Sequence, residues 1–270
     1  MRVVKITIYT AILIFMVLFS GCTTAPGKVS EVNSTNTVAS TTVATVSPSV
    51  TISIPSATAS PTLLVGFTSE DVNLHFMDLA FGGGNVYLER QPFSTTVQKP
   101  VSISVSNPNT DDIKIIEKFA VDFNGLSQST KLSENVKEGT TGQIQVKFIP
   151  PAGFGAIEMA PPVGVPINWV NKEFKKDGVT YAKVKNNIIY INSDLQGAER
   201  QHDLLLALLF ELGFKGSTMK YPDSIFFDSG NDVTSLSKID SKAVQIMYGQ
   251  GMYQGMTVDD VKKRVLITSS

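Results

Sequence analysis

The chain has 270 residues, 42% of them apolar and 17% charged, and a formal net charge of -1. This length allows one large domain or two small ones and supplies ample material for a buried core. The balanced charge and the lack of any run rich in Lys and Arg exclude a typical nucleic-acid partner, and they offer no basic patch for anionic lipid.

A short basic head and an apolar run open the chain. Arg2 and Lys5 precede the apolar segment 6–19, which is too short to span a bilayer comfortably. Residues 18–22, Leu-Phe-Ser-Gly-Cys, resemble the lipobox of prokaryotic lipoproteins, although Phe19 stands where leucine is usual. In that family the signal peptidase cuts before the cysteine, and its thiol carries a diacylglycerol.

The resemblance implies a signal peptide over residues 1–21 and a lipid on Cys22. We therefore expect the protein at the cell membrane, lipid-anchored on the extracytoplasmic face, with the membrane as its partner. An uncleaved membrane anchor is the alternative, and it gives the same topology. Cys22 is the only cysteine, so the chain can form no internal disulfide and no cysteine-based zinc cluster.

Residues 22–62 have the composition of a tether. Eighteen of the forty residues 23–62 are Ser or Thr, and only Lys28 and Glu31 are charged. Such a segment cannot bury enough apolar area to offset the entropy of ordering, so we expect it to be disordered. Asn33 begins an Asn-Ser-Thr sequon and is a candidate glycosylation site. The tether resembles those of archaeal surface lipoproteins, although bacteria use such tethers too.

From about residue 63 the sequence becomes periodic, and we expect one domain over 63–270. Acidic residues after Ser69 and three glycines from Gly82 predict the start and end of a first helix. The apolar periodicity predicts further helices over 111–124 and 194–212, and strands over 100–106, 143–149, 181–184 and 188–191. The strands thus come before the long helix, which is an α+β order.

The helix over 194–212 is apolar nearly all round, so it should be buried on most sides. Its second half and the turn after it, residues 204–217, resemble the metzincin motif H-E-x-x-H-x-x-G-x-x-H-S. Gly213 matches the turn glycine and Ser217 the serine, while Ala207 takes the place of the catalytic glutamate. The positions of the zinc ligands are held by Leu206, Phe210 and Gly216.

Two later segments resemble the same clan. Residues 221–227 resemble the Met-turn beneath the metal, with Phe226 in the place of methionine, and residues 236–249 resemble the C-terminal helix. Residues 251–261 match the tail of a related family of unknown function that also lacks the full zinc motif. The resemblance implies a zincin-like fold: a small mixed or antiparallel sheet on a buried central helix, then a helical C-terminal part.

The substituted positions argue against metzincin chemistry. Zinc requires N, O or S ligands at about 2.0–2.3 Å, and the side chains at 206, 210 and 216 provide none. Without zinc and without a glutamate at Ala207, nothing activates water for peptide hydrolysis. We expect no cofactor and no metal, and we expect Leu206 and Phe210 to close the cavity. The predicted function is therefore binding or an envelope-associated role, with a protein or envelope partner that the sequence does not identify.

Three alternatives remain. A hydrolase of another mechanism could use a cleft near the central helix, and its candidate residues are His202, Glu211, Tyr221 and Asp223. A metal site could combine His202, His75 and a carboxylate. Finally, the domain could be an unrelated α+β fold. The zincin interpretation requires the turn at Phe226 to pass beneath the face of the central helix that carries Leu206 and Phe210.

Overall fold

The computed structural model describes residues 66–90, 99–159, 171–229 and 232–268. All of them belong to one unit, Ala57–Ser270. The predicted signal peptide, the lipidation site Cys22, the sequon at Asn33 and the tether lie outside the described residues. Of the helices in the described part, none has the length and apolar character needed to cross a membrane.

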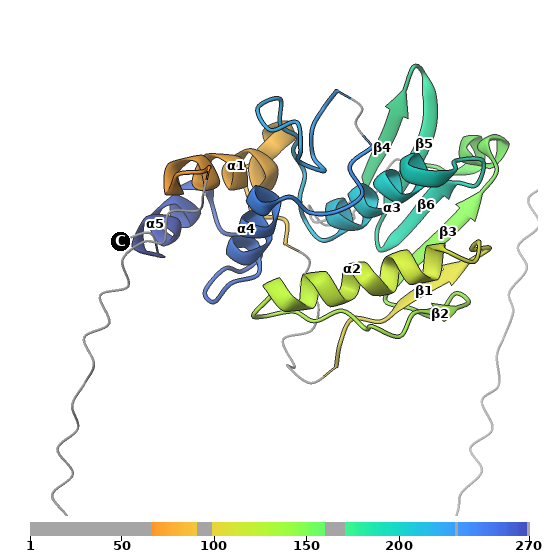
Figure 1. The fold of residues 1–270 in the computed structure, drawn as a ribbon, viewed down its shortest axis with the longest axis horizontal. Coiled ribbons are helices and arrows are strands. Elements are labelled where there is room, and N and C mark those ends of the chain that lie inside the picture. The colour runs from red at the N-terminus through yellow and green to blue at the C-terminus, as the bar shows by residue number, and fades with distance from the viewer. Residues whose placement is uncertain (1–65, 91–98, 160–170, 230–231, 269–270) are drawn as a thin grey trace, which may run out of the picture. The chain divides into compact units, whose positions relative to one another are not determined.

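The described strands form one mixed sheet of six, so the fold is α+β (Figure 1). Four strands are parallel to one another, the fifth is antiparallel to its neighbour, and the edge strand is antiparallel to the fifth. Every strand precedes the long helix in the chain, as the sequence predicted. Across the sheet the order is β2 (Lys137–Glu138), β1 (Ile103–Ser106), β3 (Ile144–Ile149), β6 (Ile188–Asn192), β5 (Val179–Lys185) and β4 (Asn171–Lys176).

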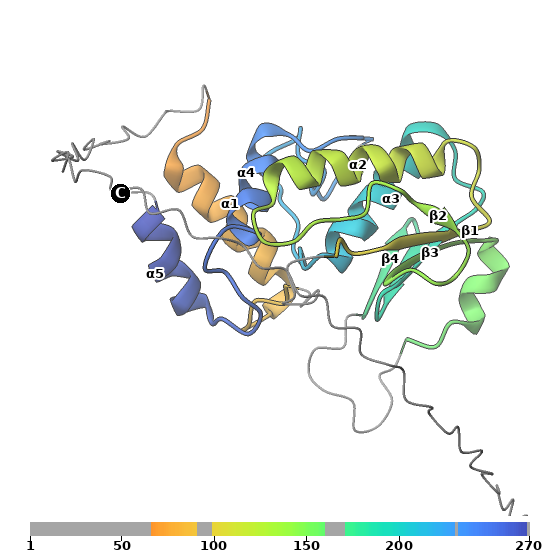
Figure 2. The ribbon, with the colours of Figure 1, turned by 90° about the horizontal axis from the view of Figure 1, so that it is seen from below.

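Two long helices cover one face of the sheet. Figure 2 shows α2 (Asp112–Leu126) and α3 (Gly197–Glu211) on this side, with the 3₁₀ segment η2 (Pro151–Ala156) on the other. The strands alternate accordingly, as in the burial of every second residue of β3, because successive side chains point to opposite faces. On the outer face Lys183 is buried beneath η2 and donates a hydrogen bond from Nζ to the carbonyl oxygen of Phe154 at 2.9 Å.

The sequence predicted four of these strands and missed two. The hairpin between β5 and β6 turns at Asn186 and Asn187, both with positive φ, in agreement with the predicted turn. Strand β4 carries a single apolar residue, Phe174, among five polar ones, so no alternating pattern marked it. Polar edge strands of this kind are common because they discourage pairing with other chains.

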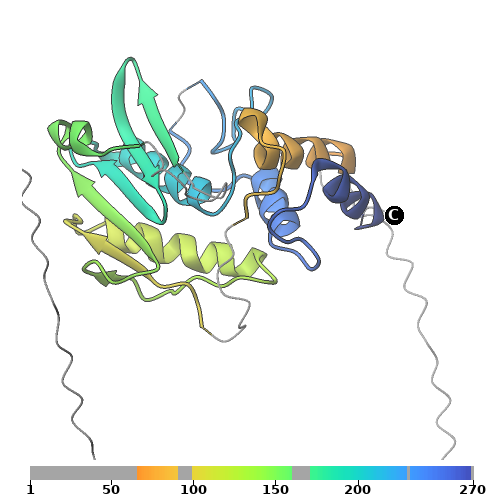
Figure 3. The ribbon, with the colours of Figure 1, turned by 180° about the vertical axis from the view of Figure 1, so that it is seen from behind.

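Three further helices pack together beside α3 (Figure 3). They are α1 (Ser69–Phe81), α4 (Lys238–Met247) and α5 (Val258–Thr268). Helix α1 begins at Ser69, and Thr68 before it is the N-cap. The Thr68 hydroxyl accepts a hydrogen bond from the Asp71 amide in a capping box. The sequence had placed this start at Ser69. The fourth helix has the same kind of cap, with Ser237 and Asp240.

Helix α3 lies in the core, as predicted: Leu204, Leu208 and Leu209 are fully buried. Its N-cap is Gln196, which differs from the predicted Asp194 by two residues. A buried ion pair fixes the start of the helix against α2. The Nε and Nη2 atoms of Arg200 donate to the two carboxylate oxygens of Asp112, each at 2.8 Å. This bidentate contact pairs the guanidinium with the carboxylate. Such pairing is needed because an unpaired charge in the core would be costly.

Candidate functional site

A cleft of about 990 Å³ runs along the exposed side of α3. Its walls come from α1, the β4–β5 hairpin, α3, α5, the segments 214–217 and 226–228, and Asp232. Leu206, Phe210 and Gly216, the three positions matched to zinc ligands, all line it. The expectation that Leu206 and Phe210 close the cavity is therefore wrong. The ring of Phe210 packs edge-on against Phe174 of β4, at 5.4 Å between centroids, so it forms part of the wall.

The backbone after α3 is held in place by glycines. Gly213 has a φ of 110°, a conformation that favours glycine, and so it serves as the turn glycine that the motif predicts. The amides of Lys215 and Gly216 both donate to the carbonyl oxygen of Leu79 in α1, at 2.8 and 2.9 Å. A Cβ atom on Gly216 would lie 1.9 Å from the carbonyl oxygen of Asp78. No histidine fits at this position unless the backbone moves.

These residues do not fit a zinc ion. The side chains of Leu206 and Phe210 have no lone pair to donate, and Gly216 has no side chain. Elsewhere in the described ranges, no three His, Cys, Asp or Glu side chains are arranged so that they could hold a metal.

The turn at residues 221–228 reaches the same cleft. Thr218 donates from its amide to the Phe226 carbonyl at 2.9 Å, and the Asp228 amide donates back to Thr218 at 3.0 Å. The ring of Phe226 lies 5.4 Å from that of Phe214, the third residue after α3 ends. Phe226 therefore borders the cleft together with Leu206 and Phe210.

His202 is the predicted site residue that lines the cleft. Its Nδ1 lies 2.8 Å from the carbonyl oxygen of Val233, so Nδ1 carries the proton and donates it. Burial lowers the pKa of His202, against the opposing effect of that hydrogen bond and of nearby carboxylates. The ring is thus neutral at pH 7, and Nε2, which makes no hydrogen bond with the described residues, remains a proton acceptor.

Asp203, the next residue, also lines the cleft and is only 6% exposed. Its carboxyl group forms no hydrogen bond or ion pair with any described residue. Burial raises the pKa of Asp203 to about 7, and the negative charges of Glu199 and Asp232 add to this effect. Burial likewise raises the pKa of Tyr181, with contributions from Asp203 and Asp228. These acidic groups therefore lie close enough for the charge of one to raise the pKa of another.

Lysines of the edge strand form the rim of the cleft. Lys176 of β4 lies 3.5 Å from Glu199 of α3, and about half of each side chain is exposed. Lys175 is paired with Glu173 of the same strand, at 3.1 Å. These contacts are exposed and contribute little stability. The rim therefore carries mixed charge, while the deeper group around Asp203 is acidic.

Glu211 lies beneath the cleft rather than in its lining, and it is fully buried. Burial raises the pKa of Glu211 to about 7, opposed by the charge of Lys215 and by a hydrogen bond from the backbone of Asn187. Lys215 does line the cleft, and burial lowers the pKa of its ammonium to about 8. Its Nζ donates to the Phe210 carbonyl at 3.0 Å and caps the end of α3.

Two further predicted residues, Tyr221 and Asp223, lie away from the cleft lining. The hydroxyl of Tyr221 donates to Asp71 at 3.3 Å, and its ring stands edge-on to that of His75, 5.0 Å away. Asp223 is exposed in the turn that follows. The sequence grouped these residues with His202 as candidates for one cleft, and in the structure only His202 of this group lines it.

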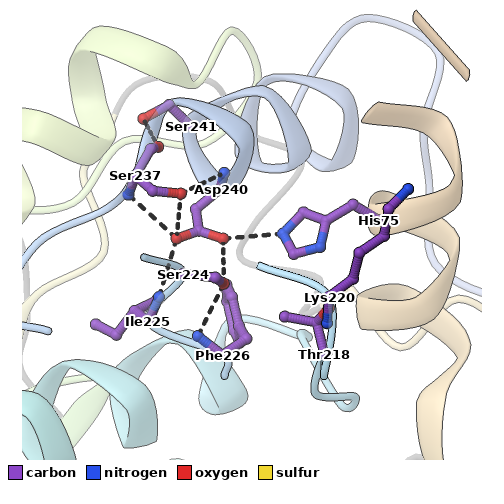
Figure 4. A network of polar contacts seen from close by, with 9 residues as sticks. All are labelled: His75, Thr218, Lys220, Ser224, Ile225, Phe226, Ser237, Asp240 and Ser241. Atoms are coloured by element: carbon purple, nitrogen blue, oxygen red, sulfur yellow. Dashed lines mark hydrogen bonds and ion pairs between the residues drawn. The ribbon is translucent and has the colours of Figure 1, made fainter. Parts of the chain in front are cut away.

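A His–Asp contact lies in the core between α1 and α4 (Figure 4). The carboxylate of Asp240 accepts hydrogen bonds from Nε2 of His75 at 2.9 Å, Oγ of Ser224 at 2.6 Å and the Ile225 amide at 3.0 Å. It also accepts from the amide and the hydroxyl of Ser237, at 3.1 and 2.9 Å. This carboxylate is fully buried and joins three segments of the chain.

The arrangement is not a catalytic triad. In a triad the imidazole stands between serine and aspartate, whereas here Asp240 stands between His75 and Ser224 (Figure 4). Burial alone would raise the pKa of Asp240, but the hydrogen bonds, first that from His75, lower it overall. His75 is committed to this network and His202 to the cleft, so the structure does not bring the two histidines together in one site.

Sequence reasoning missed most of the acidic group around Asp203. One signal was available: Glu199, Asp203, Leu206 and Phe210 follow one another at spacings of four, three and four residues, which places them on one helix face. No such signal exists for Tyr181, Asp228 and Asp232, because they reach the cleft from other segments. A scan against models of known protein families finds no match to this chain, and a search of curated proteins finds none either.

Proposed function

We propose that this protein is a lipid-anchored binding protein whose domain is zincin-like and lacks metzincin peptidase chemistry. The carrying observation is the open cleft at the positions matched to zinc ligands, Leu206, Phe210 and Gly216. A concave site with an apolar floor and a few polar groups is the usual form of a ligand site. Here Leu206, Phe210 and Phe226 contribute apolar lining, and His202 and Asp203 contribute polar groups.

The zincin part of the proposal is supported by the order of the elements. The sheet precedes a buried central helix, a glycine turn follows, and a turn bearing Phe226 reaches the cleft before helix α4. Gly216 argues against direct descent from an active enzyme, because its packing against Asp78 leaves no room for a side chain. Fold alone does not give function.

The proposed lipid anchor is based on residues 18–22 and is tested separately. We expect the mature chain to begin at Cys22 and to carry a lipid there, and we expect Cys22→Ala to abolish both. Mass spectrometry of the N-terminal peptide, isolated from membranes, measures this. A mature N-terminus at Met1, with an unmodified cysteine, would instead support an uncleaved anchor.

The absence of peptidase chemistry is tested with the full chain purified in a non-ionic detergent. Elemental analysis should find no stoichiometric zinc, and casein or a quenched peptide should stay intact. Zinc at one equivalent that a chelator removes together with peptide cleavage would contradict the proposal.

Binding in the cleft is tested with blocked dipeptides that carry apolar, acidic and basic side chains. Ser217 is an exposed residue of the cleft lining, so Ser217→Trp should obstruct the cleft without disturbing the core. Asp223→Trp places the same side chain outside the cleft and serves as the control. We expect nuclear magnetic resonance shifts from at least one probe that disappear in Ser217→Trp and persist in Asp223→Trp. Shifts that neither variant alters would place binding elsewhere.

A second candidate function, hydrolysis by another mechanism, is favoured by one observation. His202 presents an unprotonated Nε2, and Asp203 has a pKa of about 7, so the cleft holds a base beside an acid. A general base and a general acid both require a pKa near the working pH. Turnover of ester or glycoside substrates that is lost in both His202→Gln and Asp203→Asn would support this function over binding alone.

A further inference from the structure

Asp203 is an acidic group without a partner among the residues that the structure describes. The residue is only 6% exposed and lines the cleft. Its carboxylate forms no hydrogen bond or ion pair with the described residues. A buried carboxylate ordinarily has a partner, because removing it from water without one is costly. The same fold satisfies Asp240 with five hydrogen bonds. The missing partner of Asp203 is therefore expected to enter from the cleft.

The charges around Asp203 indicate the sign of that partner. Glu199 and Asp232 both act on Asp203, and Asp228 acts with it on Tyr181. The nearby cation, Lys176, lies 3.5 Å from Glu199 and is already paired there. The charge of Lys176 lowers the pKa of Asp203, but burial and the charge of Glu199 raise it by more. The group therefore favours a positively charged ligand atom.

Beyond Asp203 the same helix face becomes apolar. Leu206 and Phe210 follow at helical spacing and line the cleft. Rings continue this surface onto the hairpin, where Phe174 lies 5.4 Å from Phe210 and 5.9 Å from Tyr181. Such rings accept both an alkyl chain and an ammonium group. Lys172 and Lys215 already lie over the rings of Phe174 and Phe210, at 5.9 and 3.9 Å.

Resting on the proposed binding function, we propose that this end of the cleft recognises a primary ammonium or guanidinium group on an apolar stem. The cation pairs with Asp203, and the stem lies over Leu206 and Phe210. A lysine or arginine side chain of a peptide has this chemistry, and so does a free alkyl diamine.

A divalent metal ion is the competing cation. The described residues hold no group of three His, Cys, Asp or Glu side chains that could hold one. A bound calcium ion requires about six oxygen ligands, far more than one buried carboxylate provides. Calcium chloride nevertheless forms one arm of the test.

The test titrates the full chain, purified in detergent, by nuclear magnetic resonance or calorimetry. Nα-acetyl-lysine methylamide stands for a side chain and cadaverine for a free diamine. Nα-acetyl-norleucine methylamide is the neutral isostere of the lysine probe. A charge-assisted hydrogen bond supports an expected preference of about tenfold for the lysine probe over the norleucine probe. Comparison of the lysine probe with cadaverine then separates a peptide source from a free amine.

Asp203→Asn removes the charge at constant shape and should remove this preference. Asp223→Asn makes the same change at an exposed position outside the cleft lining and should retain it. Equal binding of the two isosteres, or a preference that survives in Asp203→Asn, overturns the inference. If both isosteres bind equally and Ser217→Trp blocks both, the proposed binding function stands while the inference fails. Saturable binding of calcium with no amine preference overturns it in favour of a metal.

Discussion

Two regions of this domain place a histidine beside an aspartate, and they treat the aspartate in opposite ways. In the core, Asp240 is fully buried, accepts five hydrogen bonds and has a lowered pKa. In the cleft, Asp203 is 6% exposed, has no partner among the described residues and has a pKa raised to about 7. The two side chains are buried to nearly the same extent, so the opposite pKa shifts reflect mainly the difference in hydrogen bonding.

The comparison separates a structural carboxylate from a candidate binding group. The carboxylate of Asp240 joins α1, the turn at Ser224 and the start of α4, and removing it leaves donors in all three segments without this acceptor. Asp203 joins nothing within the described chain, so the fold gains little from its charge. A group that reduces stability without a structural contact is a reasonable candidate for function, because active sites retain such groups.

The largest effect is expected at Asp240. Asp240→Ala should lower the free energy of unfolding by about 3–5 kcal/mol, since the buried donors of His75, Ser224 and Ile225 lose their acceptor. Urea denaturation of the full chain, followed by circular dichroism, measures this. A loss below about 1 kcal/mol would mean that the network does not hold these segments together.

The next effect is expected at the cleft wall. Gly216→Ala places a Cβ atom 1.9 Å from the Asp78 carbonyl oxygen, so the backbone must shift, and we expect a loss of about 3 kcal/mol. Gly155→Ala is the matched control, because a Cβ atom there meets nothing within 4 Å. Equal stability of the two variants would show that the wall yields easily, and that a histidine at 216 was not excluded by packing.

Asp203→Asn should stabilise the domain, and the gain should depend on pH. The pKa of Asp203 is about 7 in the folded chain against 3.8 for an ordinary aspartate, so the folded state binds more protons between these values. Stability of the native chain therefore falls as the pH rises from about 4 to 7. A shift of about three pKa units corresponds to about 4 kcal/mol. Water in the open cleft screens part of this, so Asp203→Asn should gain about 2 kcal/mol at pH 8 and almost nothing at pH 4.

The lowered pKa of Asp240 predicts the opposite slope: its contribution is present above pH 3.8 and is lost as the pH falls further. Denaturation curves at several pH values, measured for the native chain and Asp203→Asn, test both slopes. A constant difference between the two proteins from pH 4 to pH 8 would contradict the assigned pKa of Asp203.

The smallest effect is expected on the surface. Lys118 and Asp122 form an ion pair at 2.6 Å on α2, with 69% and 48% of their side chains exposed. Asp122→Asn should cost about 0.3 kcal/mol, because water and salt screen an exposed pair. This variant is the reference for the other three, because it removes the charge of an aspartate that is not buried. A cost above about 1 kcal/mol would mean that removal of charge, and not burial, explains the effect at Asp240.

The elements that the sequence predicted are those with a local signal. The apolar periods of α2 and α3, the alternation in β3 and the two asparagines of the β5–β6 turn each act within a few residues. The capping box of α4 is local too, as Ser237 and Asp240 are three residues apart. Strand β4 was missed because its stability comes from pairing with β5, and its own residues are mostly polar.

By itself, the sequence determined an α+β order with the sheet before a buried central helix, and it excluded zinc ligands at positions 206, 210 and 216. These follow from local periodicity and from the chemistry of single side chains. Only the tertiary structure decided that the cleft is open, that His75 belongs to the core, and that Asp203 lines the cleft with Asp228 and Asp232 and has no partner among the described residues. His75 and Asp240 are 165 residues apart, and no local pattern encodes a contact across that distance. Such contacts form only when the whole core packs, because each depends on the positions of elements that other contacts fix.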